Sequence, residues 1–381
     1  MKISSSFLNA IHKAPNPAYV LDESLLVDNL TTLRKVQTLT GTKVLCALKG
    51  YSMWSSFPLV KQYLEGATAS SLNEVRLCYQ EMGVKAHACF VVYLEEEFEE
   101  VLSKCSHITF NSLNQYDKFK KYITQHPTVE FALRINPEYA ASEVEKYNTC
   151  MPGSRFGILS KDLSDELPEG ITGIHFHALC ENDSSDLEKV LHNVEEKFGH
   201  LLHQATWVNM GGGHHITRKN YDLDLLYELL NNFKANYQVQ LYLEPGEAVG
   251  WETGVLSARV EDLVENSGTT TAVLNISFAA HMPDCLEMPY QPSVVGTTEN
   301  GYHYALGGNT CMSGDFVENF SLEKELNIGD TIIFKDMMHY TFVKNNTFNG
   351  VPLPAICTYK LDGSLLVNKT FSYEDFKGRL S

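Results

Sequence analysis

Along residues 24–245, short runs of apolar residues alternate with longer segments whose apolar residues recur every three or four positions. The longer segments predict amphipathic helices, and the short runs between them predict strands. The predicted strands are residues 44–48, 67–70, 88–93, 107–110, 130–135, 173–177, 206–210 and 240–244. Eight strands with intervening helices over about 220 residues indicate an α/β fold, the (β/α)8 TIM barrel. A doubly wound open sheet is the structural alternative.

The predicted helices include residues 25–39, 72–82, 113–123, 187–203 and 225–236. Residues that favour helix starts precede two of them, Asp22 before the first and Asn111 before the segment 113–123. Their side-chain oxygens accept hydrogen bonds from the free N–H groups of a first turn. These starts support the barrel interpretation.

The pattern changes after Gly250, where helical spacing gives way to short strands separated by turn residues. Predicted strands include 255–260, 271–278, 331–334 and 355–358, with turns at 266–268, 327–330 and 362–363. This pattern predicts an all-β domain. A further strand, 18–21, has no partner in the barrel pattern and is expected to pair with the later domain. We therefore expect a barrel over residues 23–248 and a C-terminal β domain over 249–381 together with 1–22.

The composition is that of a folded protein with an acidic surface. Of 381 residues, 44% are hydrophobic and 20% charged, and 30 Lys and Arg against 47 Asp and Glu give a net charge of −17. Such a surface repels phosphate backbones and anionic lipid, so neither nucleic acid nor a membrane is an expected partner. A polycationic ligand would be attracted.

Nine cysteines are scattered along the chain without a Cys-x-x-Cys pair. The odd number and the spacing indicate reduced thiols rather than a disulfide or zinc framework. The first residues show no signal-peptide pattern, and no stretch is long and apolar enough to span a bilayer. A cytoplasmic location is expected.

Two polar features stand at the ends of predicted barrel strands, where barrel enzymes place their active sites. Lys49 ends the first strand. A buried amine there would lose basicity and act as a Schiff-base nucleophile, whereas an extended side chain would reach solvent as most lysines do. His175 and His177 share one face of the sixth strand. That pair suits a metal, a ring stacked on a flat cofactor, or an internal hydrogen-bond network.

The loops after the seventh and eighth strands supply further candidates. Gly211-Gly212-Gly213 lets the backbone approach an anion, and Glu244-Pro245-Gly246-Glu247 follows the next strand. Barrels commonly bind phosphate with these two loops, although each also fits a plain tight turn. Cys311 lies between glycines, where a thiol either shuttles a proton or serves the structure.

Together these elements resemble the fold-type III pyridoxal-phosphate decarboxylases, the group of ornithine and diaminopimelate decarboxylases. The matching motifs cover nearly the whole chain in the family's order. They are Ala47-Leu48-Lys49, Leu133-Arg134-Ile135-Asn136-Pro137, Arg155-Phe156-Gly157, Phe176-His177, Gly211-Gly212-Gly213, Glu244-Pro245-Gly246, Cys311 and His339-Tyr340-Thr341. The resemblance implies a PLP-dependent carboxy-lyase whose TIM barrel binds the cofactor, with no catalytic metal.

The resemblance also implies a role for each motif. Lys49 would hold pyridoxal 5'-phosphate as an internal aldimine, His177 would stack on its ring, and Glu244 would pair with the ring nitrogen. The phosphate would be held by Gly211, Gly212, Gly213, Gly246 and Tyr340. Cys311 would reach into a neighbouring subunit's site and help reprotonate the α-carbon, so the active unit would be a homodimer with shared active sites.

Two longer motifs, 175–181 and 281–290, are similar to those of carboxynorspermidine and carboxyspermidine decarboxylases within that family. This likeness implies loss of CO₂ from carboxynorspermidine or carboxyspermidine to give norspermidine or spermidine in polyamine biosynthesis. Carboxylates would neutralise the distal ammonium groups of such a substrate. The candidates are Glu247, Asp284, Glu287 and Asp315, with Glu181 as a further one.

Three other functions fit parts of the sequence. The same fold serves decarboxylases of diaminopimelate, ornithine and arginine, which a substrate panel separates. A metal-dependent barrel hydrolase would use His175, His177, His214 and His215, and bound zinc would identify it. A regulatory protein similar to antizyme inhibitors would keep the fold without activity, but the presence of Lys49 and Cys311 argues against this.

Overall fold

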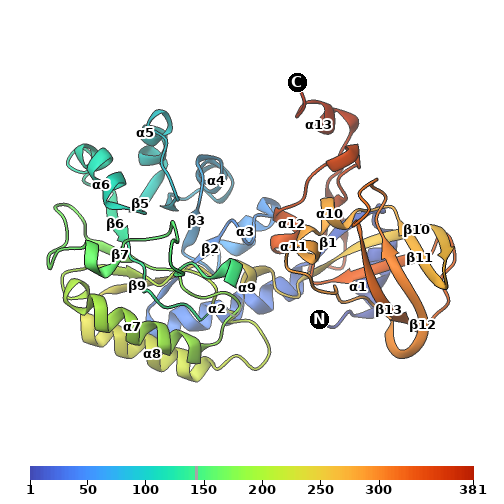
Figure 1. Cartoon of the computed structure of the whole chain (residues 1–381), viewed down its shortest axis with the longest axis horizontal. Coiled ribbons are helices and arrows are strands. Elements are labelled where there is room, and N and C mark those ends of the chain that lie inside the picture. Colours follow the sequence, from blue (N-terminus) through green and yellow to red (C-terminus); the bar gives the residue numbers. More distant parts are fainter. Residues whose placement is uncertain (142–144) are drawn as a thin grey trace. The chain divides into compact units, whose positions relative to one another are not determined.

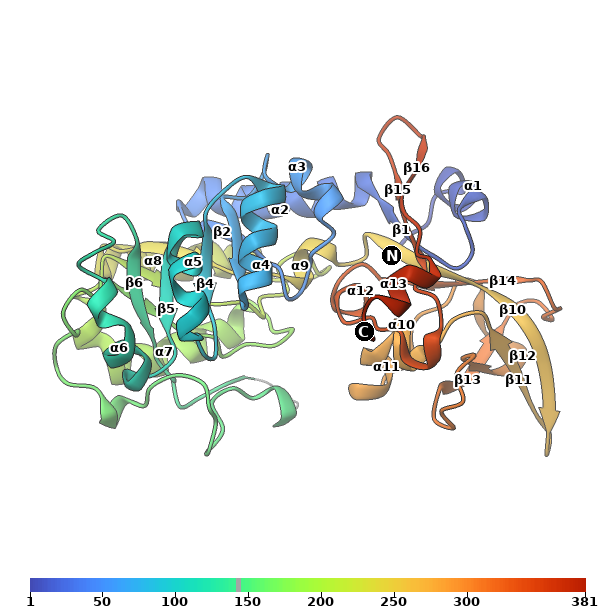
Figure 2. The same ribbon diagram turned by 90° about the horizontal axis from the view of Figure 1, so that it is seen from above.

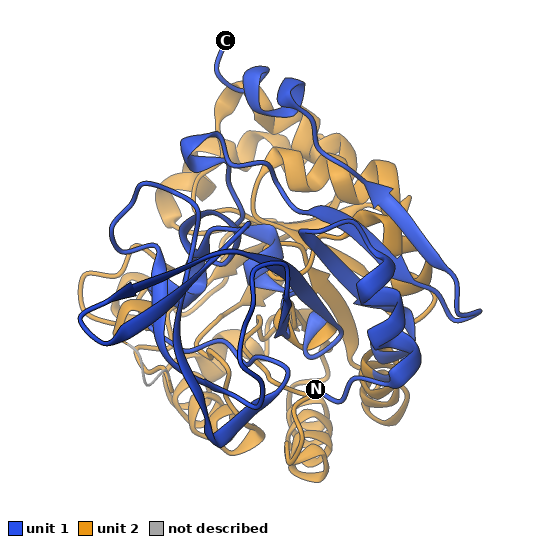
Figure 3. Ribbon diagram, turned by 90° about the vertical axis from the view of Figure 1, so that its right-hand side faces the viewer, with its two compact units in different colours: residues 1–28, 250–381 blue, residues 29–249 orange. Residues whose placement is uncertain are grey.

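The computed structural model describes residues 1–141 and 145–381. The chain forms two compact units, which Figure 3 shows in different colours. We call residues 29–249 the barrel unit and residues 1–28 with 250–381 the sheet unit. Helix α2, Glu23–Thr40, begins in the sheet unit and continues into the barrel unit. No helix in the described ranges is long and apolar enough to cross a membrane.

The barrel unit is built on a closed barrel of eight parallel strands (Figures 1 and 2). The strands are β2 Lys43–Ala47, β3 Gly66–Ala69, β4 Ala86–Cys89, β5 Cys105–Phe110, β6 Glu130–Arg134, β7 Gly173–His175, β8 Trp207–Asn209 and β9 Gln240–Leu243. Each pairs with the next, and Val44 of β2 pairs with Leu243 of β9 to close the ring. This closure confirms the predicted TIM barrel and excludes the open sheet.

Helices lie outside the strands of this barrel (Figure 1). They are α3 Phe57–Val60, α4 Leu72–Leu77, α5 Glu95–Lys104, α6 Leu113–Phe119, α7 Ser184–Leu202, α8 Leu223–Tyr237 and α9 Glu247–Gly250. Single turns, 3-10 except for the π-helical η2, are η1 Trp54–Ser56, η2 Cys78–Met82, η3 Lys120–Tyr122, η4 Glu145–Tyr147 and η5 Ser160–Asp162. Amphipathic spacing explains α7, which buries Leu187, Val194 and Phe198 along one face.

The barrel interior is packed with side chains. Leu45, Ala132, Trp207 and Tyr242 form one buried cluster there. Gly173 of β7 is needed beside Trp207, because a Cβ at that position would lie 2.1 Å from the indole ring. A filled interior leaves the carboxyl ends of the strands as the place for a polar site.

Several predicted strands are too long. The segment 173–177 is strand only over Gly173–His175, so His177 lies beyond β7 and does not share a strand face with His175. The segment 88–93 is strand only as far as Cys89, where β4 ends. Beyond it the chain turns, and the Tyr93 hydroxyl lies 3.1 Å from the carbonyl oxygen of Ala88 and 3.0 Å from that of Thr109. Cys89 therefore stands at the carboxyl end of its strand rather than inside it.

One predicted helix start is wrong. Helix α6 is capped by Ser112, whose side chain accepts a hydrogen bond from the N–H of Gln115 at 3.2 Å. Asn111 does not cap the helix. Its Nδ2 donates to the Arg155 carbonyl at 2.8 Å, and its Oδ1 accepts from the Gly157 N–H at 3.0 Å. The Asp22 prediction is confirmed, because its Oδ1 accepts from the N–H of Ser24 at the start of α2.

The sheet unit contains an eight-stranded mixed sheet in the order β13-β12-β11-β10-β1-β15-β16, with β14 paired to β10. Its strands are β1 Ala18–Asp22, β10 Gly254–Asn266, β11 Thr269–Leu274, β12 Thr297–Gly307, β13 Phe316–Leu322, β14 Thr331–Lys335, β15 Ala355–Tyr359 and β16 Leu365–Lys369. Strand β1 lies between β10 and β15, antiparallel to the first and parallel to the second. This placement confirms that the segment 18–21 pairs with the later strands.

Short helices accompany this sheet, although the sequence predicted only strands there. They are α1 Ser5–Lys13, α10 Phe278–His281, α11 Pro283–Glu287, α12 Tyr340–Val343 and α13 Tyr373–Lys377, with η6 at Phe348–Gly350. The predicted strand 271–278 therefore ends early, because Ser277 caps α10 by accepting from the Ala280 N–H at 3.0 Å. The predicted turn at 266–268 is confirmed, with positive φ at Ser267 and Gly268 joining β10 to β11.

Candidate active site

Lys49 follows β2 in a tight turn at the carboxyl end of the barrel. The turn is closed by a hydrogen bond from the Gly50 N–H to the Ala47 carbonyl at 2.9 Å. A Cβ on Gly50 would lie 2.8 Å from the Cα of Gly246, so two glycines are needed where these backbones meet. This close approach brings the lysine turn against the loop that follows β9.

The surroundings of the Lys49 amine disfavour its charge. Burial lowers the pKa of Lys49, the Glu244 carboxylate opposes this shift, and the Arg134 guanidinium adds to it. The side chain is only partly exposed. A less basic amine spends more time neutral at ordinary pH, and the neutral form is the one that attacks a carbonyl carbon.

The triple-glycine loop follows β8 and is held very close to its neighbours. Gly211 and Gly213 have φ of +71° and +87°, and a Cβ on Gly213 would lie 2.0 Å from the Leu179 carbonyl oxygen. The Gly211 N–H donates to Asn209 Oδ1 at 2.9 Å, and the Gly212 N–H donates to His177 Nδ1 at 3.0 Å. Two of the three loop amides therefore fix neighbouring side chains, and phosphate binding by this loop stays a prediction.

His177 presents a neutral ring of fixed orientation. Its Nδ1 accepts the Gly212 hydrogen bond, which leaves the ring proton on Nε2. Burial lowers the pKa of His177 well below its ordinary value, and the positive charges of Lys49 and Arg134 lower it further. A neutral, fixed ring suits packing against another flat ring rather than proton donation.

Glu244 is a buried, ionised carboxylate directly after β9. Its Oε1 accepts from Asn209 Nδ2 at 2.7 Å, and its Oε2 lies 3.6 Å from His175 Nε2. Burial would raise the pKa of Glu244, but His175, the charge of Lys49 and the Asn209 hydrogen bond together lower it to about 2. Glu244 is thus negatively charged at ordinary pH and interacts electrostatically with the Lys49 amine.

Two of the family motifs lie together at another part of this end of the barrel. The guanidinium carbons of Arg134 and Arg155 lie 4.6 and 4.3 Å from the centre of the Phe156 ring. Asn111 holds the second of these motifs, Arg155-Phe156-Gly157, through its bonds to Arg155 and Gly157. Asn111 was predicted as a helix cap, so its contribution to the site was missed.

Cys311 lies in the sheet unit, exposed in the connection between β12 and β13. Its N–H and Sγ lie 3.0 and 3.2 Å from Asn349 Oδ1. Asp315 shapes the same connection, because its carboxylate accepts from the Ala279 N–H at 2.9 Å and from Thr310 Oγ1 at 2.5 Å. The buried Asp315 therefore acts within the loop that carries Cys311.

Asp284 and Glu287 share a cation in the sheet unit. The Lys344 amine donates to Asp284 and, at 2.6 Å, to Glu287. Asp284 is buried and Glu287 is exposed, both on α11, while Lys344 follows α12. Lys344 was not among the residues predicted from the sequence, because no motif includes it.

The remaining candidate residues lie on other elements. Glu247 is the first residue of α9, Glu181 has a φ of +56°, and Tyr340 begins α12. His214 and His215 are buried beside the triple-glycine loop. Among the described residues, no group of three or more His, Cys, Asp or Glu is arranged to hold a metal ion.

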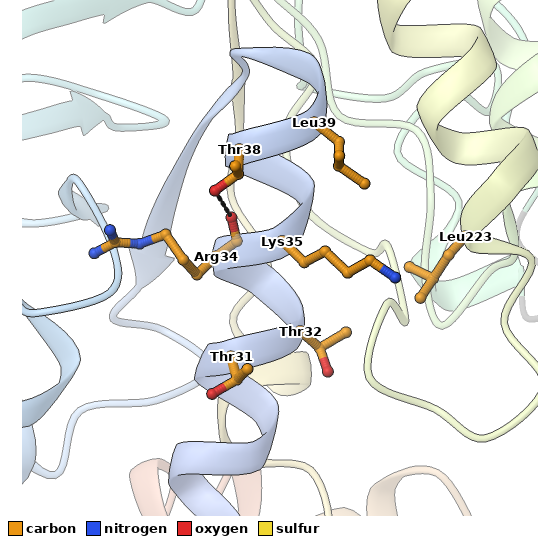
Figure 4. A pocket seen from close by; sticks show the side chains of 7 residues that line it. All are labelled: Thr31, Thr32, Arg34, Lys35, Thr38, Leu39 and Leu223. Carbon is orange, nitrogen blue, oxygen red and sulfur yellow. Dashed lines mark hydrogen bonds between the residues drawn. The ribbon is translucent and has the colours of Figure 1, made fainter.

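A surface depression elsewhere on the barrel unit is unrelated to these residues. It lies on α2 and is lined by Thr31, Thr32, Arg34, Lys35, Thr38, Leu39 and Leu223 (Figure 4). Thr38 Oγ1 donates to the Arg34 carbonyl at 3.0 Å, and none of the strand-end residues lines it. The candidate catalytic residues lie instead at the strand ends.

Comparison with known proteins identifies the family of this chain. A family model described as "Pyridoxal-dependent decarboxylase, C-terminal sheet domain" matches residues 18–338. The chain belongs to the pyridoxal-dependent decarboxylases. This enzyme therefore uses pyridoxal phosphate to decarboxylate its substrate, as the resemblance implied.

Two relatives are equally similar to this decarboxylase. A carboxyaminopropylagmatine decarboxylase from Synechocystis sp. is 42% identical over 96% of this chain and 95% of its own. A carboxynorspermidine/carboxyspermidine decarboxylase from Campylobacter jejuni is 42% identical over 96% of this chain and 99% of its own.

Solved structures agree with the fold. The crystal structure of carboxynorspermidine decarboxylase from Campylobacter jejuni, complexed with norspermidine, has a TM-score of 0.89 and 41% identity. The match covers 96% of this chain and 100% of the chain in that crystal structure. A diaminopimelate decarboxylase structure has a TM-score of 0.82 at 18% identity, covering 98% of this chain and 95% of that chain, a likeness of fold alone.

The strand ends fit the cofactor that the family uses. The poorly basic amine of Lys49 suits the cofactor's aldehyde, and the neutral, fixed ring of His177 suits its flat ring. The buried carboxylate of Glu244 suits the ring nitrogen. The glycine loop, whose space a Cβ would fill, suits the phosphate. Bound pyridoxal phosphate supplies an electron sink for the charge left when CO₂ departs. Lys49 would hold the aldehyde carbon, His177 would orient the ring, and Glu244 would keep a proton on the ring nitrogen.

Proposed function

We propose that the enzyme removes CO₂ from carboxynorspermidine or carboxyspermidine, giving norspermidine or spermidine in polyamine biosynthesis. The observation that carries the proposal is 42% identity over 96% of the chain with the Campylobacter relative of that name. The motifs 175–181 and 281–290 support the same substrate class.

Carboxyaminopropylagmatine is a second candidate substrate, because the Synechocystis relative is equally similar. The two classes share the amino-acid head that loses CO₂ and differ at the far end. One ends in a compact ammonium and the other in a planar guanidinium, which prefers a forked pair of acceptors.

The acidic candidates suit either far end. Asp284 and Glu287 against Lys344 leave one negative charge in excess. A substrate cation would compete with the Lys344 amine for these oxygens, so Lys344 would set how strongly that cation binds. Glu247 and Glu181 are further candidates, and Asp315 would act from the loop that it shapes.

The substrate assignment is tested by measuring kcat/KM for carboxynorspermidine, carboxyspermidine, carboxyaminopropylagmatine and diaminopimelate. We expect the first two to be turned over fastest, and a preference for diaminopimelate would contradict the proposal. Glu287→Gln and Asp315→Asn should raise KM while cofactor binding is retained. Glu299→Gln, which removes an exposed carboxylate of β12, is the control and should leave KM unchanged.

We also propose that the enzyme acts as a homodimer in which Cys311 of one subunit completes the site of the other. The exposed thiol in the β12–β13 connection suits that role. Lys49→Ala and Cys311→Ala proteins should each be nearly inactive, and a refolded mixture should regain activity if sites are shared. A mixture as inactive as its components would contradict shared sites.

A further inference from the structure

A contact between side chains crosses the barrel interior beside the site. Cys89 ends β4 and His175 ends β7, and β5 and β6 separate these strands in the barrel. Cys89 Sγ lies 3.8 Å from His175 Nδ1, and His175 Nε2 lies 3.6 Å from Glu244 Oε2. An imidazole that is 1% exposed therefore stands between a thiol and a carboxylate.

Glu244 is held on its other side by Asn209. Asn209 Nδ2 donates to Glu244 Oε1 at 2.7 Å, and Asn209 pairs with His175 in the register of β7 and β8. Each carboxylate oxygen thus faces one polar side chain. Side chains from the adjacent strands β7 and β8 thus both face the Glu244 carboxylate, and this limits rotation of that side chain.

The charges around the imidazole come from several strands. Cys89 of β4 and Glu244 after β9 face it directly, and the nearby His177 and His214 are rings whose pKa burial lowers below the ordinary value. Burial would favour the neutral form of His175, but Cys89 and Glu244 raise its pKa to about 9.

Nearby positive charges lower the pKa of the Cys89 thiol. Burial opposes ionisation of Cys89, yet His175 and the Arg134 guanidinium lower its pKa below the ordinary value. The charge of Lys49 also acts on Glu244, where it lowers the pKa of that carboxylate. His175 therefore lies between two acidic groups, the Cys89 thiol and the Glu244 carboxylate.

We propose that Cys89 and His175 are positioning residues, a thiol–imidazole pair 3.8 Å apart that holds the Glu244 carboxylate ionised and aimed at the ring nitrogen of the cofactor. The proposal deepens the proposed function and rests on Glu244 as the partner of that nitrogen, whichever acid is the substrate. A buried charged imidazole is strongly destabilising unless anions face it. Here an acidic group lies on each side, the Cys89 thiol and the Glu244 carboxylate, whereas a side chain that only filled space would be apolar.

The pair gives the site an upper pH limit. While His175 keeps its proton, both oxygens of Glu244 are engaged by donors or positive charge. When the proton leaves, Glu244 faces a neutral ring and loses part of its alignment. Removing the Cys89 side chain should make that proton leave at lower pH, because Cys89 raises the pKa of His175 and an opposite charge at such distances shifts a pKa by about one unit or more.

The test compares wild type, Cys89→Ala, Cys89→Ser, His175→Gln and the double variant Cys89→Ala/His175→Gln as purified holoenzymes. The readouts are the pH titration of the bound cofactor's absorbance and the pH profile of kcat. We expect both Cys89 variants to move the alkaline transition down by about one pH unit or more, with KM little changed. His175→Gln should abolish that transition and lower kcat by about tenfold.

The double variant separates a coupled pair from two independent effects. If the thiol acts through the imidazole, the double variant should match His175→Gln rather than multiply the two losses. The matched control is Cys105→Ala, which removes a buried thiol at the opposite, amino end of β5. This control should leave both pH profiles unchanged.

Three results would overturn the proposal: an unshifted alkaline transition in both Cys89 variants, equal effects of Cys89→Ala and Cys105→Ala, or losses that multiply in the double variant. Circular dichroism establishes that each variant folds, and Cys89→Ser keeps the size of the side chain. The absorbance titration needs no substrate. A wrong polyamine assignment would therefore leave this result intact, and the two failures are distinguishable.

Discussion

Asn209 shows how one amide fixes two parts of the site. Its Nδ2 donates to Glu244, and its Oδ1 accepts from the Gly211 N–H. Because the amide both donates and accepts, it orients a carboxylate and a glycine loop at once. An aspartate of the same shape would place a second negative charge 2.7 Å from Glu244. The residue is buried, so its two bonds are made in a region of low dielectric, where they are strong.

Gly213→Ala should weaken cofactor binding. The position has a φ of +87°, and a Cβ would lie 2.0 Å from the Leu179 carbonyl oxygen, so the loop must move. We expect the cofactor dissociation constant to rise about tenfold or more, equivalent to about 1.4 kcal/mol. Equilibrium dialysis or absorbance titration with pyridoxal phosphate measures this.

Gly199→Ala in helix α7 is the matched control. A Cβ there meets only the Tyr237 hydroxyl at 3.6 Å, an ordinary contact. Cofactor affinity should stay at the wild-type value, and stability should stay level or rise, because alanine favours helix more than glycine does. Equal affinities for Gly213→Ala and wild type would contradict the role given to the loop.

At the level of elements, two neighbouring residues at the start of α6 have different roles, since Ser112 caps the helix and Asn111 contacts the site. Ser112→Ala removes the hydrogen bond to the Gln115 N–H and should lower the free energy of unfolding by about 1 kcal/mol. Cofactor affinity should not change. Asn111→Ala instead releases the Arg155–Gly157 turn, and should reduce cofactor affinity or kcat.

Urea unfolding and cofactor titration on both variants measure this difference. If Asn111→Ala lowered only stability while Ser112→Ala lowered only cofactor affinity, the assignment of the two neighbours would be reversed. Pairing them is informative, since the side chains are adjacent in sequence and differ in what they contact.

The sequence predicted the strands well where burial alone decides them. All eight barrel strands follow from apolar runs, because both faces of a parallel strand are covered. The end of β4 was misplaced, because 88–93 is apolar throughout and only the Tyr93 contacts show where the chain turns. That error hid Cys89, whose role depends on standing at a strand end opposite His175.

Other site contacts depend on partners that are distant in sequence. Lys344 meets Asp284 across 60 residues, and Asn209 meets Glu244 across 35. Neither residue belongs to a motif, so local pattern gives no reason to select it. The family motifs located Lys49, His177 and Glu244, but not the side chains that orient them.

At the scale of the whole molecule, buried histidines should make stability depend on pH. Burial lowers the pKa of His107, His214 and His281 to about 4, and it lowers the pKa of His87 well below its ordinary value. The unfolded chain takes up these protons below about pH 6.5, whereas the folded chain resists until lower pH. The free energy of unfolding should therefore decrease as the pH is lowered, by up to about 1.4 kcal/mol per pH unit for each histidine.

Urea unfolding at a series of pH values between about 6.5 and 4.5 measures this slope at constant salt. His175 does not contribute in that window, because a pKa raised to about 9 adds stability that is lost only on the alkaline side. His107→Gln removes one titrating ring, which stacks on His87 at 3.8 Å, and should flatten the slope. A slope that is the same with and without His107 would contradict the assignment.

The net charge of −17 belongs to this scale too. It sets a long-range attraction for a polycationic substrate, while selectivity between far ends falls to local carboxylates. Raising ionic strength should therefore lower kcat/KM for every polyamine acid by a similar factor. The ratio between two such substrates should change little, since screening acts on charge rather than shape.

The most direct measurement of the central claim is an internal competition. Carboxynorspermidine and carboxyaminopropylagmatine are supplied together at equal concentration to the holoenzyme, and the two decarboxylated products are quantified over the first few per cent of reaction. The ratio of products equals the ratio of kcat/KM values. We predict an excess of norspermidine that disappears entirely with Lys49→Ala. An excess of the guanidino product, or norspermidine formation that persists without Lys49, would contradict the account.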